Sequence, residues 1–135
     1  MSAGIPPKPV TILLRLEGAA VFVAMLFAFR SLGGNWWLFA LLALAPDLAM
    51  LGYLAGRKTG ATAYNLVHTY VAPFVLAALG VVAALPWLLP IAAIWAAHIG
   101  ADRALGYGLK YPDGFNMTHL GPIGRGRTAA HANAG

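Results

Sequence analysis

Four long apolar runs dominate the pattern of hydrophobic and polar positions along this chain. Short polar or Gly- and Pro-rich turns separate the runs, which cover residues 10–29, 36–55, 61–85 and 90–108. Each run has about twenty residues, the length of helix that spans the hydrocarbon core of a bilayer. The pattern therefore predicts an all-α fold, a polytopic four-helix membrane bundle in residues 1–121, followed by a flexible tail in residues 122–135.

The composition agrees with a membrane protein. Of the 135 residues, 60% are hydrophobic and 10% are charged, whereas about 25% of the residues in a soluble domain are charged. The chain has no cysteine, which excludes disulfides and thiolate metal sites. The net charge of +5 comes from basic residues that flank the apolar runs. We therefore expect the lipid bilayer as a partner and no nucleic acid, while a homo-oligomer and a larger membrane complex both stay open.

Lysine and arginine are distributed unequally between the two ends of the predicted bundle. Arg30 is the only basic residue in the turns at one end. The other end, which includes both termini, has Lys8, Arg57, Lys58, Lys110, Arg125 and Arg127. Because basic loops stay in the cytoplasm, this distribution predicts that both termini are cytoplasmic. An interfacial belt of tryptophans is expected at the opposite surface, formed by Trp36, Trp37 and Trp87.

Five acidic residues and histidines lie inside the apolar runs, where a charge costs about 2.5–3.5 kcal/mol on insertion scales. They are Glu17, Asp47, His68, His98 and Asp102. At 1.5 Å per helical residue, all five lie about 9–15 Å from the cytoplasmic ends of their helices. Four antiparallel helices thus place them in one layer, and His98 and Asp102 share a helix face because they are four residues apart. Since the chain has only four acidic residues, we expect the three in this layer to be used.

Carboxylates and imidazoles at one depth are a ligand set for zinc, manganese or iron. Three carboxylates and two histidines suffice for one ion, but they fall short of the usual di-iron set, and the chain has no Glu-x-x-His pair. A structural polar network is the alternative, in which Arg15 and Arg103 pair with Glu17 and Asp102, or protons neutralise the carboxylates. A path for protons or solutes is the third interpretation.

Six short motifs occur along the chain, and the first four include the five predicted metal ligands. They are Leu14-Arg15-Leu16-Glu17-Gly18, Ala45-Pro46-Asp47-Leu48, Tyr64-Asn65-Leu66-Val67-His68-Thr69-Tyr70, His98-Ile99-Gly100-Ala101-Asp102-Arg103, Gly106-Tyr107-Gly108-Leu109-Lys110-Tyr111 and Thr118-His119-Leu120-Gly121. With these motifs, the chain resembles a family of small bacterial membrane proteins, domain of unknown function 4260. The resemblance implies a four-helix membrane protein and draws attention to His119, but it implies no activity.

The leading hypothesis is a metal-dependent enzyme, a hydrolase or an oxidoreductase, in the bacterial inner (plasma) membrane and acting on a lipid-soluble substrate. The predicted metal ligands are Glu17, Asp47, His68, His98 and Asp102, and the three carboxylates are also the candidate acid–base groups. The predicted substrate-binding residues are Arg15, Asn65, Arg103, Lys110 and His119. A proton-coupled or small-solute transporter and a non-catalytic subunit or assembly factor stay open as alternatives, so the sequence does not decide whether the chain is an enzyme.

Overall fold

The computed structural model describes residues 6–111 and 114–122, and helices make up most of this part of the chain. Its elements in order are α1 (Lys8–Ser31), α2 (Trp36–Leu42), η1 (Ala45–Ala55), α3 (Arg57–Val67), α4 (Val71–Val82), α5 (Leu88–Leu105), β1 (Lys110–Tyr111), β2 (Gly114–Thr118) and β3 (Gly121–Pro122). The predicted helical architecture is confirmed. The predicted tail lies outside the described residues except for Pro122.

Three helical segments are long and apolar enough to cross a membrane, namely Lys8–Ser31, Trp36–Ala55 and Leu88–Leu105. α3 and α4 form a fourth span if this pair, bent by 42°, is counted as one segment. The length and composition of these helices indicate a membrane protein. Large apolar side chains also point outward, and those of Trp37, Leu54 and Val82 are between 86% and 88% exposed, as expected for a surface that lipid covers.

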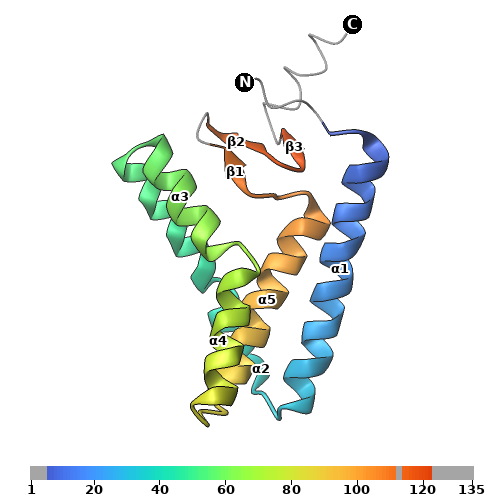
Figure 1. Ribbon diagram of the computed structural model, residues 1–135, viewed down its shortest axis with the longest axis vertical. Coiled ribbons are helices and arrows are strands. Elements are labelled where there is room, and N and C mark those ends of the chain that lie inside the picture. Colours follow the sequence, from blue (N-terminus) through green and yellow to red (C-terminus); the bar gives the residue numbers. More distant parts are fainter. Residues whose placement is uncertain (1–5, 112–113, 123–135) are drawn as a thin grey trace, which may run out of the picture.

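α5 lies at the centre of the arrangement, with α1 and α4 packed against it on different sides (Figure 1). η1 and α3 pack against each other as a hairpin that leans away from α1 (Figure 1). The start of α1, the turn between η1 and α3, and the strands lie at one end of the molecule, whereas the turns before α2 and α5 lie at the other. This up-and-down course agrees with alternating spans. Which end faces the cytoplasm stays a prediction.

A close backbone contact joins α1 to α5. A Cβ atom added at Gly100 would come within 2.7 Å of both the Gly18 carbonyl oxygen and the Phe22 nitrogen. A Cβ atom added at Gly18 would come within 2.8 Å of the Gly100 carbonyl oxygen. Small residues at helix interfaces in membranes allow this kind of approach. The two glycines therefore fix how closely α1 lies against the helix that carries His98 and Asp102.

The second apolar run is not one uniform helix. α2 ends at Leu42, and residues Ala45–Ala55 form a 3-10 helix of 11 residues, although such runs are seldom longer than about 3–4 residues. Pro46, near the start of this 3-10 helix, lacks a backbone N–H and cannot continue the hydrogen bonding of α2. Asp47 thus lies in the first turn of an unusual helix, a setting that often marks a functional position.

The segment after α5 forms a small antiparallel sheet, which the sequence did not predict. Gly106 ends α5 with a φ of 93°, a left-handed conformation that favours glycine. Lys110 of β1 then pairs with Thr118 of β2, and Thr118 pairs with Gly121 of β3. Residues 112–113, between β1 and β2, lie outside the described part. The sheet lies at the end of the molecule where α1 begins (Figure 1).

Candidate metal centre

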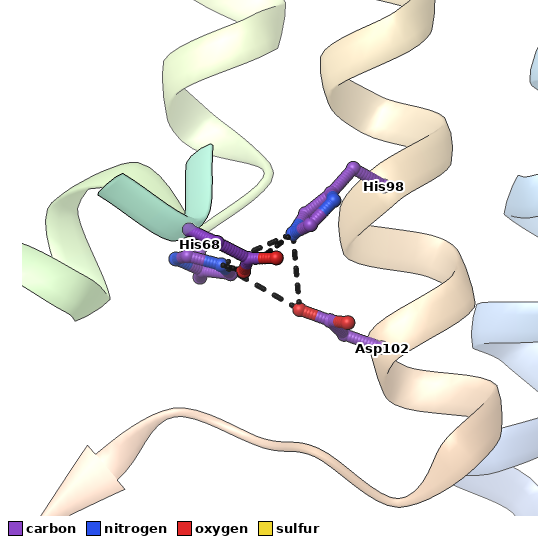
Figure 2. A group of neighbouring side chains, drawn as sticks. His68, His98 and Asp102 are labelled. Atoms are coloured by element: carbon purple, nitrogen blue, oxygen red, sulfur yellow. Dashed lines mark hydrogen bonds and ion pairs between the residues drawn. The ribbon is translucent and has the colours of Figure 1, made fainter. Parts of the chain in front are cut away.

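Four of the five predicted ligands come together in one group, and Asp47, His68, His98 and Asp102 each offer one donor atom within 4.8 Å of the others. The two histidine Nε2 atoms are 3.2 Å apart. Asp47 Oδ1 lies 3.4 Å from the His68 Nε2 atom and 3.2 Å from that of His98. Asp102 Oδ2 lies 3.5 and 3.3 Å from the same two nitrogens. Figure 2 shows His68, His98 and Asp102 pointing toward one another.

Three elements of the fold position the four donors. Asp47 lies in the first turn of η1, and His68 lies at the C-terminal end of α3, within the bend before α4. His98 and Asp102 lie one turn apart on α5, as their spacing predicts. The side chains of His68 and His98 are 3% and 9% exposed, whereas those of Asp102 and Asp47 are 21% and 41% exposed. The group is therefore closed on the histidine side and open at Asp47.

The spacing of the donors suits a small divalent cation. The five distances given above lie between 3.2 and 3.5 Å. Donors bound at zinc distances of about 2.0–2.1 Å in a tetrahedron stand about 3.3–3.4 Å apart. Neutral imidazole and carboxylate are both ligands that zinc accepts. Five of the six donor spacings match a single zinc ion or an ion of similar size, and the sixth, between the oxygens of Asp47 and Asp102, is within 4.8 Å.

A hydrogen bond on the far side of its ring orients His68 as a ligand. His68 Nδ1 lies 2.9 Å from the carbonyl oxygen of Tyr64, so in the neutral ring Nδ1 carries the proton and donates it to this carbonyl. The lone pair is then on Nε2, which faces the group. The backbone of Ala43 lies next to the ring of His98. Such outer contacts are what hold a metal-binding histidine in its tautomer and orientation.

A stack of side chains supports His68 from behind. The Tyr64 ring lies parallel to the His68 ring at 3.8 Å between centroids, and Lys110 Nζ lies 4.9 Å from the centroid of the Tyr64 ring. Asn65 fixes the strand that carries Lys110, because its amide donates to the Lys110 carbonyl at 2.8 Å and accepts from the Lys110 N–H at 2.6 Å. The amide of Asn65 thus positions β1 beside the candidate metal centre.

Lys110 is 2% exposed, and burial lowers the pKa of its ammonium group to about 8, although the charge of Asp102 acts in the opposite direction. In the unfolded chain this pKa returns to its ordinary value of about 10.4. The unfolded state therefore binds more protons than the folded state between these two values. The free energy of unfolding is expected to rise with pH across this window, by at most about 1.4 kcal/mol per pH unit.

This expectation can be checked by SDS-induced unfolding of the detergent-purified protein between pH 7 and pH 9.5. Lys110→Met removes the titrating group and keeps a similar side-chain length, so its stability should rise less over the same range. Equal pH profiles for the two proteins would contradict the burial of a titrating Lys110.

Two side chains of α5 satisfy the carbonyls that the bend in the third apolar run leaves without helical partners. Trp95 Nε1 donates to the Val67 carbonyl at 2.7 Å, and Arg103 Nη2 donates to the His68 carbonyl at 3.0 Å. A backbone carbonyl without a hydrogen bond is costly within a membrane. Trp95 and Arg103 therefore stabilise the bend that presents His68. Sequence reasoning did not identify Trp95, although it lies three residues before His98 and hence near its face of α5.

Three further predicted site residues, Glu17, Arg15 and His119, lie outside the group of four donors. Glu17 is outside the group and lines a neighbouring pocket of about 200 Å³ together with Arg103 and His119. Arg15 is exposed, and its Nε donates to the Ala104 carbonyl at 2.8 Å. His119 Nδ1 accepts the Leu109 N–H at 2.9 Å. Depth in the membrane predicted that Glu17 lies in the same layer as the four donors. It did not predict the direction of the side chain, which lines a separate pocket.

An apolar pocket of about 260 Å³ lies against the candidate metal centre. Its lining includes Pro46 and Val67, which directly precede Asp47 and His68. It also includes Trp95, about one turn before His98 on α5. An apolar molecule in this pocket would be in reach of the donor atoms. The pocket therefore supports the prediction of a lipid-soluble substrate.

The sequence model of one protein family, described as Domain of unknown function (DUF4260), matches residues 11–123. The chain belongs to this family. The match spans all four donors and the strands that follow α5, so the candidate metal centre lies within the part that DUF4260 defines. No match is found among curated proteins or solved structures. DUF4260 carries no assigned activity, and a function has to be inferred from the geometry of the site.

Proposed function

We propose that this protein is a metal-dependent membrane hydrolase that acts on a lipid-soluble ester. The observation that carries the proposal is the convergence of four electron-pair donors from Asp47, His68, His98 and Asp102. Two imidazole nitrogens and two carboxylate oxygens at these distances repel one another unless a cation or protons lie between them. One divalent cation satisfies all four, whereas protons would have to be shared among them.

The four residues differ in what they can contribute. His68, His98 and Asp102 are the less exposed donors and hold the ion. Asp47 is 41% exposed and lies on the 3-10 helix, so it is the donor that can leave the ion or accept a proton from an attacking water. When bound, a divalent ion would supply Lewis-acid chemistry at a substrate carbonyl. A carboxylate placed beside it is suited to act as a general base.

The substrate would enter from the apolar side of the site. The pocket beside Pro46 and Trp95 has the size of a short hydrocarbon chain and no charged lining residue. An ester with an apolar acyl group would place that group there and its carbonyl near Asp47. The buried cation of Lys110, near Asp102, would favour the negative charge that develops on the reacting oxygen. This combination favours esters with acyl chains over small polar esters.

The proposal is tested with p-nitrophenyl esters of increasing acyl chain length in detergent micelles, using protein reconstituted with zinc. Hydrolysis should be faster for esters with longer acyl chains than for the acetate ester. Asp47→Asn keeps the shape of the side chain but removes its basicity, and it is expected to lower kcat by at least about 100-fold. Asp113→Asn, the same change at the acid outside the four apolar runs of the sequence, is the matched control.

Hydrolysis that survives both a chelator and Asp47→Asn would contradict the proposal. Without hydrolysis, an Asp47-dependent proton flux into liposomes would favour the transporter instead. Oxidation of a substrate by the iron-loaded protein would point to the oxidoreductase alternative.

A further inference from the structure

A second cavity lies on the opposite side of α5 from the candidate metal centre. It is an almost entirely apolar groove of about 610 Å³ between α1 and α4, with α5 as its floor. Ala24 and Ala28 of α1 line one wall, and Ala92 and Ala96 of α5 line the floor. These small side chains leave room that longer ones would fill. The volume lies within the range of about 300–1,000 Å³ that small-molecule sites have.

The apolar groove adjoins the polar pocket that contains Glu17. Tyr70 lines both cavities. On α1, Ala24 of the groove lies seven residues after Glu17 of the polar pocket, and Ala28 lies four residues after Ala24. The three residues therefore follow one stripe along the helix. The two cavities thus form a site with a polar end near the strands and an apolar end toward the turn before α2. This is the shape of an amphiphile that lies along the helices.

The polar pocket holds one positive and one negative charge that do not neutralise each other. Arg103 is 9% exposed, and its guanidinium contacts neutral groups. Nη1 lies 2.9 and 3.2 Å from the two ring nitrogens of His119, and Nη2 donates to the His68 carbonyl. Burial, followed by the charge of Arg103, lowers the pKa of His119 to about 4, so this ring is neutral at pH 7.

Glu17 is the carboxylate of the same pocket. Within residues 6–111 and 114–122, Glu17 makes no ion pair within 4.0 Å, and no carboxylate lies that close to Arg103. The buried charge of Arg103 is costly without a counter-ion. A ligand whose head has an anionic and a cationic group would satisfy both residues at once.

We propose that this combined site binds one ethanolamine phospholipid. Its phosphate accepts hydrogen bonds from Arg103, its ammonium group donates to Glu17, and one acyl chain lies in the groove over Ala92 and Ala96. A primary ammonium has three N–H donors for a carboxylate, as a lysine side chain has. Because bilayer tails are as apolar as the groove, the head group decides which lipid is chosen. The proposal does not depend on metal binding, since the site faces away from His98 and Asp102.

The test is native mass spectrometry of the delipidated, chelator-treated protein in detergent, titrated with synthetic lipids that have identical acyl chains. One phosphatidylethanolamine molecule should be retained, with about tenfold higher affinity than phosphatidylglycerol, which lacks the ammonium group. Glu17→Gln should lower the affinity for phosphatidylethanolamine about tenfold and leave that for phosphatidylglycerol unchanged or higher. Glu17 is exposed, so this substitution leaves the fold intact.

A second pair of variants tests the groove. Ala24→Trp fills the groove and should abolish the retention of both lipids, whereas Val23→Trp places the same ring on an exposed position of α1 outside it. Val23→Trp should bind as the unchanged protein does. Equal or tighter binding of phosphatidylglycerol, an unaltered affinity in Glu17→Gln, or retention that survives Ala24→Trp would each overturn the proposal. Circular dichroism of every variant shows whether it is folded, and a folded protein that retains no lipid also overturns it.

Discussion

Replacing His98 by alanine is expected to remove the bound metal ion from the protein. The His98 Nε2 atom is the donor with the shortest distances to the others, at 3.2 Å from both Asp47 Oδ1 and His68 Nε2. The substitution leaves one imidazole and two carboxylates, of which Asp47 is largely open to solvent. Loss of an outer partner of a metal ligand already costs 10- to 100-fold in affinity, so loss of a ligand should cost at least about 100-fold.

Elemental analysis of the detergent-purified protein measures this effect directly. The unchanged protein should hold about one zinc, manganese or iron ion per chain, and His98→Ala less than a tenth of that amount. His131→Ala makes the same chemical change outside the residues that form the centre, and it should keep the ion. If the unchanged protein held no stoichiometric ion after zinc reconstitution, protons rather than a metal would neutralise the four donors. The proposed metal-dependent hydrolase would then be wrong.

Adding one methyl group at Gly100 should destabilise the bundle by about 3 kcal/mol or more, the upper range for overpacking. The new Cβ would meet the Gly18 carbonyl oxygen and the Phe22 nitrogen, both at 2.7 Å. Both are backbone atoms of α1, so no change of rotamer relieves the contact. α1 would have to move away from α5 along its length, and much of the packing between these two helices would be lost.

SDS-induced unfolding, followed by circular dichroism, compares Gly100→Ala with the unchanged protein. Ala20→Val is the matched control, because it adds two methyl groups at an exposed position of α1 and should change the stability by less than about 0.5 kcal/mol. A stability of Gly100→Ala equal to that of the unchanged protein would show that α1 and α5 are farther apart than the glycine contact requires.

Depth and helical spacing were sufficient to predict most of the candidate centre. Asp47, His68, His98 and Asp102 all lie in one layer, and the bundle brings their side chains together. Glu17 has the same depth but a different direction. Its neighbour Gly18 is the residue that meets α5, and successive helical residues point about 100° apart. The rotation of a helix about its axis depends on its closest contact, and the sequence does not show which glycines form it.

The departures from regular helix were harder to predict. Pro46 can interrupt an α-helix, but a 3-10 helix of 11 residues depends on tertiary packing rather than on local preference. The break at His68 depends on Trp95 and Arg103, which are 28 and 35 residues away from the carbonyls they bind. The strands after α5 are only two to five residues long. Asn65 helps to hold them in place through the backbone of Lys110.

The bend at His68 has a consequence for how the protein assembles. The residues of α3 and α4 leave the ribosome before Trp95 and Arg103 of α5 do, so the carbonyls of Val67 and His68 have no side-chain partners at that time. In hydrocarbon, a continuous helix would satisfy those carbonyls instead. We therefore expect residues 57–82 to enter the bilayer as a straight helix. The helix would then bend when α5 docks, in the step that also brings His98 and Asp102 to His68. Insertion of the last span and completion of the candidate metal centre would then be a single event.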